Sequence, residues 1–157
     1  IDSLNGVYVY YNGGVGNVEE RNMAGEYNLG LKYQCVEFVK RYYYEYYDHQ
    51  MPDSYGHARD FFKEGLADGA LNTERDLRQY TNPSREKPKV GDLIVFGPSL
   101  LNRYGHVAIV SKVNEQALEI TQQNPGPFGD SREDLPLHDN CADWEVGNDR
   151  VVGWLRK

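Results

Sequence analysis

The chain has 157 residues, of which 39% are hydrophobic and 26% are charged, so it is long enough to bury a core and has a globular composition. Its formal net charge of −7 argues against nucleic acid or an anionic membrane surface as the main partner, because both bind basic surfaces. A cationic substrate such as a polyamine is compatible with this charge. No apolar run approaches the roughly 20 residues that span a bilayer, so we expect no membrane insertion.

No repeat, low-complexity tract or linker divides the sequence, and we expect a single domain over residues 1–157. The chain begins at Ile1 and shows no signal pattern, which leaves export open. Neither a C-x-x-C nor an H-E-x-x-H pattern is present, so we expect no zinc site.

The first third of the chain contains one strong helix signal. Residues 1–11 end in a β-branched and aromatic run that predicts a strand, residues 12–16 predict a flexible turn or loop, and residues 17–29 look irregular or partly helical. Gly30 is a natural helix breaker. The run from there to Tyr47 has apolar side chains at helical spacing, namely Cys35, Val36, Val39, Tyr42, Tyr43 and Tyr46. This spacing predicts a helix that starts near Cys35.

The middle of the chain suggests two further helices and one buried strand. Asp53-Ser54 precedes a second helical pattern, whose apolar members are Ala58, Phe61, Phe62 and Leu66. Residues 73–80 predict a short third helix, and residues 82–88 predict a loop. The stretch 90–96 is a turn followed by continuous apolar residues, which is typical of a buried strand.

The last third of the chain predicts an antiparallel hairpin. Residues 105–113 and 117–123 are β-rich runs, and the turn 114–116 joins them. Residues 130–149 are rich in Asp, Glu and Asn, and we expect them to be irregular. A final strand is predicted over residues 151–155.

Cys35 is the candidate nucleophile. A helix N-terminus presents unpaired N–H groups and the positive end of the helix dipole, and both lower the pKa of a thiol. Two alternatives remain open from the sequence. Cys35 is a small core residue in the first, and it forms a structural disulfide with Cys141 in the second.

His106 begins the first hairpin strand, and Gln122 ends the second. In an antiparallel pair the start of one strand lies beside the end of the next, so we expect the two side chains to be close together. With Cys35 they make a candidate catalytic triad. The thiol would attack a carbonyl carbon, His106 would take and return the proton, and Gln122 would orient the imidazole.

Two further residues are candidates at the same site. The Gln34 side chain, together with the backbone N–H of Cys35, is a candidate donor to an oxyanion. Asn124 is a candidate supporting residue beside them. Each polar residue alone is more typical of a structural role, and their joint placement carries the hypothesis.

Five segments together resemble a known family: GLKYQCVEF, VGDLIVF, GHVAIV, QQN and VVGWL. The set is similar to the cysteine, histidine-dependent amidohydrolase/peptidase (CHAP) family, and within it to the amidase domain of bifunctional glutathionylspermidine synthetase/amidase. This resemblance implies an α+β, papain-like fold in which N-terminal helices pack on an antiparallel β-sheet. It also implies Cys35 as nucleophile and His106 as base, with no metal or organic cofactor.

The sequence departs from the family at the third catalytic position. The family usually has Glu there, in an E-x-N pattern, whereas this chain has Gln122-Gln123-Asn124. A glutamine keeps the hydrogen-bond acceptor but loses the negative charge that stabilises an imidazolium. We therefore predict a lower His106 pKa, and a weaker thiolate–imidazolium pair, than a glutamate would give.

The resemblance implies hydrolysis of an amide bond through a thioester. Bacterial cell-wall peptidoglycan peptides are the first expected substrate, cleaved by a secreted or periplasmic rather than cytoplasmic protein. A glutathionylspermidine-type amidase, acting on a polyamine–glutathione amide, is the alternative that the acidic charge favours. A weak or inactive binding module of the same fold is the third reading, which Gln122 supports. An inhibitor or immunity protein stays open as a partner.

Overall fold

The computed structural model describes residues 2–11, 20–126 and 129–157. These residues form one α-helix, α1 (Cys35–Tyr47), one short 3₁₀ helix, η1 (Ala58–Phe61), and twelve strands. Within the same described residues, no helix is long and apolar enough to cross a membrane.

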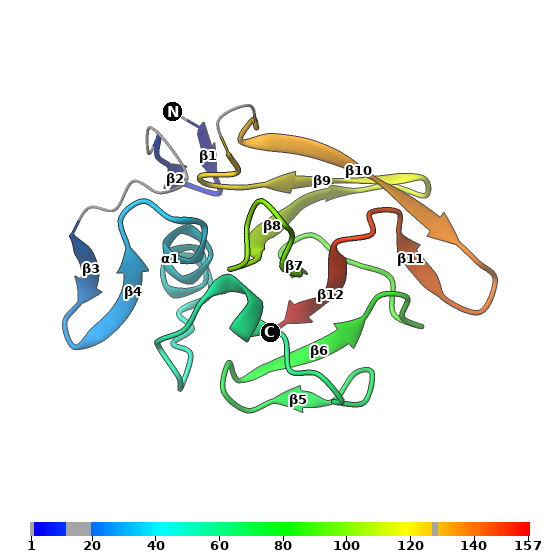
Figure 1. Cartoon of the computed structure of the whole chain (residues 1–157), viewed down its shortest axis with the longest axis horizontal. Coiled ribbons are helices and arrows are strands. Elements are labelled where there is room, and N and C mark those ends of the chain that lie inside the picture. The colour runs from blue at the N-terminus through cyan, green and yellow to red at the C-terminus, as the bar shows by residue number, and fades with distance from the viewer. Residues whose placement is uncertain (1, 12–19, 127–128) are drawn as a thin grey trace.

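Eight of the strands form one antiparallel sheet with the order β11-β10-β9-β8-β7-β12-β6-β5 (Figure 1). In chain order they are β5 (Leu71–Asn72), β6 (Leu77–Thr81), β7 (Leu93–Phe96), β8 (His106–Val113), β9 (Ala117–Thr121), β10 (Arg132–Asp139), β11 (Trp144–Val146) and β12 (Val151–Arg156). Two separate hairpins lie before α1 in the chain: β1 (Asp2–Leu4) with β2 (Val7–Val9), and β3 (Arg21–Ala24) with β4 (Tyr27–Leu31). Helix α1 lies between the β3–β4 hairpin and the sheet (Figure 1).

Helix α1 forms where the apolar spacing predicts it. It begins after Gln34, which has extended backbone geometry, and it ends at Asp48, whose positive φ of 53° turns the chain while its N–H bonds to Tyr43 O. The face that carries Phe38 and Tyr42 is fully buried, because it packs on the sheet.

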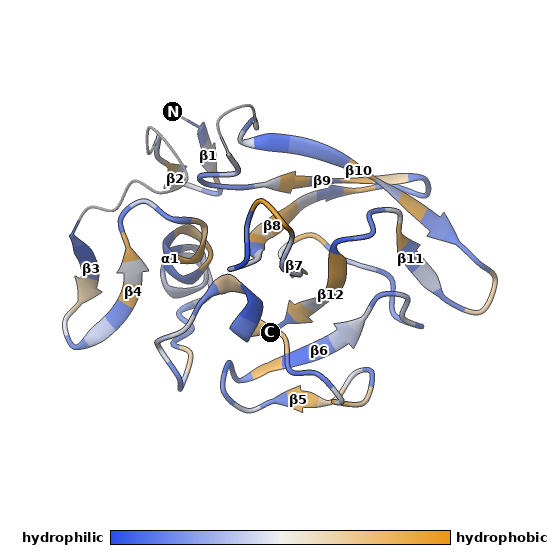
Figure 2. Ribbon diagram, in the orientation of Figure 1, coloured by the Kyte–Doolittle hydropathy of each residue, from blue (hydrophilic) through white to orange (hydrophobic). Residues whose placement is uncertain are grey.

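Both faces of the central strands are buried, which explains their continuous apolar sequences. On one face, Val95 and Val107 pack with α1 and η1 in a first core. On the opposite face, Ala108 and Ile120 belong to a second core that includes Trp154. In Figure 2 the hydrophobic residues of α1, β8 and β12 gather at the centre, whereas much of β10 is hydrophilic.

The predicted strands and hairpin in the second half are present as β7, the β8–β9 pair and β12. The expected strand over residues 1–11 is present as the hairpin of β1 and β2. The loop predicted for residues 12–16 lies outside the described residues. Gly30 is not a breaker but a strand residue of β4, with a φ of +122° that disfavours other residues, and a Cβ there would contact the Glu37 backbone tightly, at 3.3 Å.

Several predictions of element type were wrong. The second helical pattern supplies only η1, because Gly56 and Gly65 have positive φ values and break the run. The third helix is absent among the described residues, and residues 71–81 form the β5–β6 hairpin instead. The stretch 20–29 is the β3–β4 hairpin, not irregular or helical. The acidic region 130–149 forms β10 and β11, because Leu135 and Leu137 alternate with exposed residues and join the second core.

Candidate active site

Cys35 is the first residue of α1 and lies at the edge of the first core, where it is partly exposed. Both cysteines are free thiols, and Cys141 is exposed in the turn between β10 and β11. The disulfide alternative is therefore wrong.

The Cys35 sulfur lies where the helix start meets β8. Burial raises the pKa of the Cys35 thiol, and the backbone N–H groups of Val107, Val36 and Cys35 itself act in the opposite direction. The helix N-terminus was expected to lower the thiol pKa, but here burial outweighs the N–H groups. The influence of Val107 is informative because this residue directly follows His106 in β8.

His106 is 8% exposed and lies beside Gln122, as the hairpin register predicts. Its Nε2 is 2.8 Å from Gln122 Oε1. The pKa of His106 is lowered to about 4, mainly because the ring is buried; the hydrogen bond to Gln122 acts in the opposite direction, and the nearby Arg150 charge adds to the lowering. The lowering comes from burial, so the expectation that a glutamate at position 122 would give a higher His106 pKa stays a prediction.

The contact with Gln122 fixes the tautomer of the imidazole. An amide oxygen can only accept a hydrogen bond, so Nε2 of His106 must carry the proton. In the neutral ring, Nδ1 is then the unprotonated nitrogen, which is the atom that a general base uses. The resting site therefore combines a protonated thiol with a neutral imidazole.

Gln34 and Asn124 lie against each other at the start of α1. The Nδ2 group of Asn124 donates to Gln34 Oε1 over 2.8 Å, and Asn124 itself has a positive φ of 54°. Asn124 therefore holds the Gln34 amide by its oxygen, beside the residue that begins α1. The five residues proposed from the sequence thus lie at or next to the start of α1, the start of β8 and the end of β9.

A comparison with protein families matches residues 25–124 to the model of the CHAP domain. The chain belongs to the CHAP family. With the antiparallel sheet and the helix that begins at Cys35, this match confirms the α+β, papain-like class. The CHAP family is one of amidases and peptidases.

Two curated relatives come from Crithidia fasciculata. A trypanothione synthetase is 30% identical over 105 residues, which is 67% of this chain and 16% of the relative. A glutathionylspermidine synthase is 33% identical over 141 residues, which covers 81% of this chain and 19% of the relative. The CHAP chain therefore spans less than a fifth of the length of each of these relatives.

The candidate site is supported by a buried polar network that the sequence did not reveal. Gln123 is fully buried, and its Nε2 donates to the carbonyl of Gln34 over 2.8 Å and to Glu37 over 3.2 Å. Its Oε1 accepts from the backbone N–H of Tyr10 and from Arg41. Gln123 thereby ties the end of β9 to the turn that carries Cys35. Burial of charged residues on one helix face has no signal in hydrophobic spacing, which is why this network was missed.

We predict that Arg41→Ala lowers the free energy of unfolding by about 3–5 kcal/mol, because it leaves the buried Glu37 carboxylate without its charge partner. Arg41 Nε is 2.7 Å from Glu37 Oε2, and Glu37 is fully buried. The matched control is Lys112→Ala, since Lys112 is 76% exposed and its contact with Glu119 is 3.7 Å. Urea unfolding of both variants is the measurement, and equal losses would show that the Glu37 pair does not stabilise this fold.

We also predict the pH dependence of Cys35 alkylation in a Cys141→Ser protein. Because burial raises the thiol pKa above its ordinary value of 9.0, the thiolate fraction should still increase above pH 9. The rate of iodoacetamide labelling, followed by mass spectrometry, should therefore rise throughout the alkaline range. A rate that is already constant from pH 7 upward would reveal a preformed thiolate and contradict this environment.

No three His, Cys, Asp or Glu side chains of the described ranges cluster as metal ligands.

Proposed function

We propose that this CHAP domain is a cysteine amidohydrolase that cleaves an amide bond through a thioester. The observation that supports it best is the 2.8 Å hydrogen bond between His106 and Gln122, beside a strand residue whose N–H acts on the Cys35 sulfur. In this proposal Cys35 is the nucleophile, His106 is a base of the correct tautomer, and Gln122 orients it.

The proposed reaction begins when Cys35 Sγ attacks the carbonyl carbon and its proton passes to Nδ1 of His106. The oxyanion is stabilised by the backbone N–H of Cys35 and the NH₂ of Gln34. The tetrahedral intermediate collapses, the C–N bond breaks, and His106 gives its proton to the departing amine. Water, deprotonated by His106, then attacks the thioester, which releases the carboxylic acid and restores the thiol.

The substrate class that we favour is an amide between glutathione and a polyamine. The names of both relatives refer to conjugates of this kind, glutathionylspermidine and trypanothione. The net charge of −7 also suits a cationic substrate. Neither relative's name mentions a cell-wall substrate, so peptidoglycan peptides take second place.

A direct assay separates the candidates. The protein is incubated with glutathionylspermidine and, separately, with peptidoglycan fragments, and release of free amine is followed. Release of spermidine that is lost in Cys35→Ala is the expected result. Amine release only from the peptidoglycan fragments would change the substrate class. A protein that binds either compound without releasing amine would be a binding module, which would overturn the hydrolase proposal.

A further inference from the structure

Three polar side chains occupy the same face of three neighbouring strands, β8, β9 and β10. Along each strand the residues at spacings of two belong to the second core: Ala108 and Val110 on β8, Leu118 and Ile120 on β9, and Leu135 and Leu137 on β10. Continuing these alternations places His106, Gln122 and Glu133 on that face. They form a row across the sheet, at the end of the second core.

Gln122 connects the other two members of this row. Its side chain is 2% exposed, and its Oε1 is 2.8 Å from Nε2 of His106. Its Nε2 donates to the backbone oxygen of Asp130 over 2.8 Å and to Glu133 Oε2 over 3.3 Å. A carbonyl oxygen and a carboxylate both only accept hydrogen bonds, so the amide can face them only with its NH₂ group.

We propose that Glu133 is a positioning residue for His106, acting through Gln122; this inference rests on the proposed hydrolase function. The Glu133 carboxylate holds the Gln122 amide in the orientation that presents its oxygen to the imidazole. Hydrogen bonding to the NH₂ group also polarises the amide, which strengthens its oxygen as an acceptor when His106 becomes protonated. The site is therefore built for a glutamine, since a carboxylate at position 122 would face two acceptors.

The groups around His106 determine how easily its imidazole takes up a proton. Cys35 approaches from the start of α1. Arg150, which precedes β12, opposes protonation of the imidazole, and its guanidinium lies 5.8 Å from the Phe96 ring beside His106. Glu133 on β10 is the anionic group of the described row; it is exposed, and its carboxylate accepts a hydrogen bond from the Gln122 amide. Its loss should therefore affect the catalytic step rather than substrate binding.

The test uses Gln122→Glu, Glu133→Ala and the double variant Gln122→Glu with Glu133→Gln in the full chain. Gln122→Glu alone should lower kcat/KM at least about tenfold, because the new carboxylate faces Asp130 O and Glu133. The double variant should recover about fivefold or more of this loss, because the introduced glutamine can donate to the new carboxylate. Glu133→Ala should lower kcat about tenfold and leave KM unchanged, since an amide that is no longer held orients His106 less well.

Asp134→Ala is the matched control, because Asp134 is an exposed carboxylate like Glu133 but lies on the opposite face of β10. Urea unfolding identifies any variant that fails to fold, and if Gln122→Glu does so, the comparison of Glu133→Ala with Asp134→Ala decides. Equal kcat values for those two variants, or no recovery in the double variant, would overturn the role of Glu133. The rate at which iodoacetamide labels Cys35 reports on the site in each variant without any substrate. Amide hydrolysis at the wild-type rate in Cys35→Ala would instead refute the proposed cysteine mechanism itself.

Discussion

Replacement of Cys35 by alanine is expected to lower kcat/KM for amide hydrolysis by at least about a thousandfold, because no other group at the site can form the thioester. Cys35 occupies the first turn of α1, and its sulfur is influenced by the N–H groups of that turn and of Val107. Alanine retains the helix propensity and leaves only a small space, so the fold should be preserved. Amine release at saturating and limiting substrate measures the effect.

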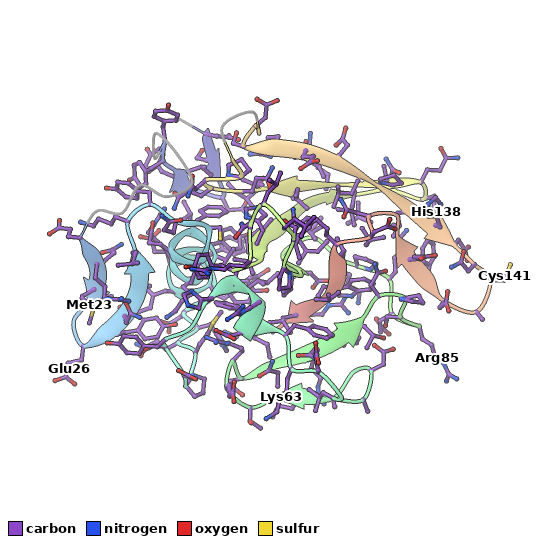
Figure 3. All side chains as sticks on the ribbon, in the orientation of Figure 1. Met23, Glu26, Lys63, Arg85, His138 and Cys141 are labelled. Carbon is purple, nitrogen blue, oxygen red and sulfur yellow. The ribbon has the colours of Figure 1, made fainter. Side chains whose placement is uncertain are left out.

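Cys141→Ser is the control for this experiment. Figure 3 labels Cys141 at the outer end of the sheet, in the turn between β10 and β11 and far from α1. The activity of the Cys141→Ser variant should equal that of the wild type. A strong loss in Cys141→Ser, or hydrolysis that continues in Cys35→Ala, would remove Cys35 from the role of nucleophile.

Replacement of His106 by alanine is the second large effect that we expect, a loss of about 10²–10⁴-fold in kcat. The resting thiol is protonated, because burial raises its pKa, so attack requires a base at the same moment. His106 holds its Nε2 proton against Gln122 and has its other nitrogen available. KM should change much less than kcat, because the imidazole acts on the proton rather than on substrate binding.

The pH profile of the wild type provides a second reading of His106. Its pKa of about 4 means that the base stays unprotonated well below neutral pH. The acid limb of the kcat/KM profile should therefore lie below pH 6, and it should be absent from the residual activity of His106→Ala. His138→Ala is the matched control, since Figure 3 shows His138 on β10 near Cys141, away from α1. Equal kcat values for the two histidine variants would rule out His106 as the base.

The parts of the fold that could be predicted from the sequence are those in which one pattern dominates. Helix α1 has an apolar stripe, and β7 and β8 are continuous apolar runs, because packing on both faces leaves no polar alternation. The pairing of His106 with Gln122 followed from antiparallel geometry alone.

The secondary structure predicted for other segments was wrong because tertiary packing overrode the local sequence pattern. Phe61 has helical spacing to its neighbours, but the glycines around it permit only one 3₁₀ turn that caps the first core. Strand β10 looks irregular because most of its residues are charged and exposed, and only Leu135 and Leu137 reveal its alternation. Burial against the rest of the sheet turns that weak signal into a strand.

The candidate site shows the same contrast between residues with a clear sequence pattern and residues without one. The proposed catalytic residues lie in recognisable sequence motifs, whereas the buried residues that position them do not. Glu37 and Gln123 are fully buried polar groups, and nothing in their sequence positions distinguishes them from surface residues. Glu133 lay in a segment expected to be irregular, so its contact with Gln122 could not be foreseen. From the sequence, Gln122 therefore looked like a weaker substitute for the family's glutamate. In the structure its NH₂ group donates to Asp130 O and to Glu133, which a glutamate carboxylate could not do.

The most direct measurement compares two rates in the Cys141→Ser protein at pH 9: alkylation of Cys35 by iodoacetamide, mapped by mass spectrometry, and loss of amide hydrolysis. A thioester mechanism predicts the same rate constant for both, with added substrate slowing both equally. A protein that is completely alkylated at Cys35 and still hydrolyses its substrate at the original rate would contradict it.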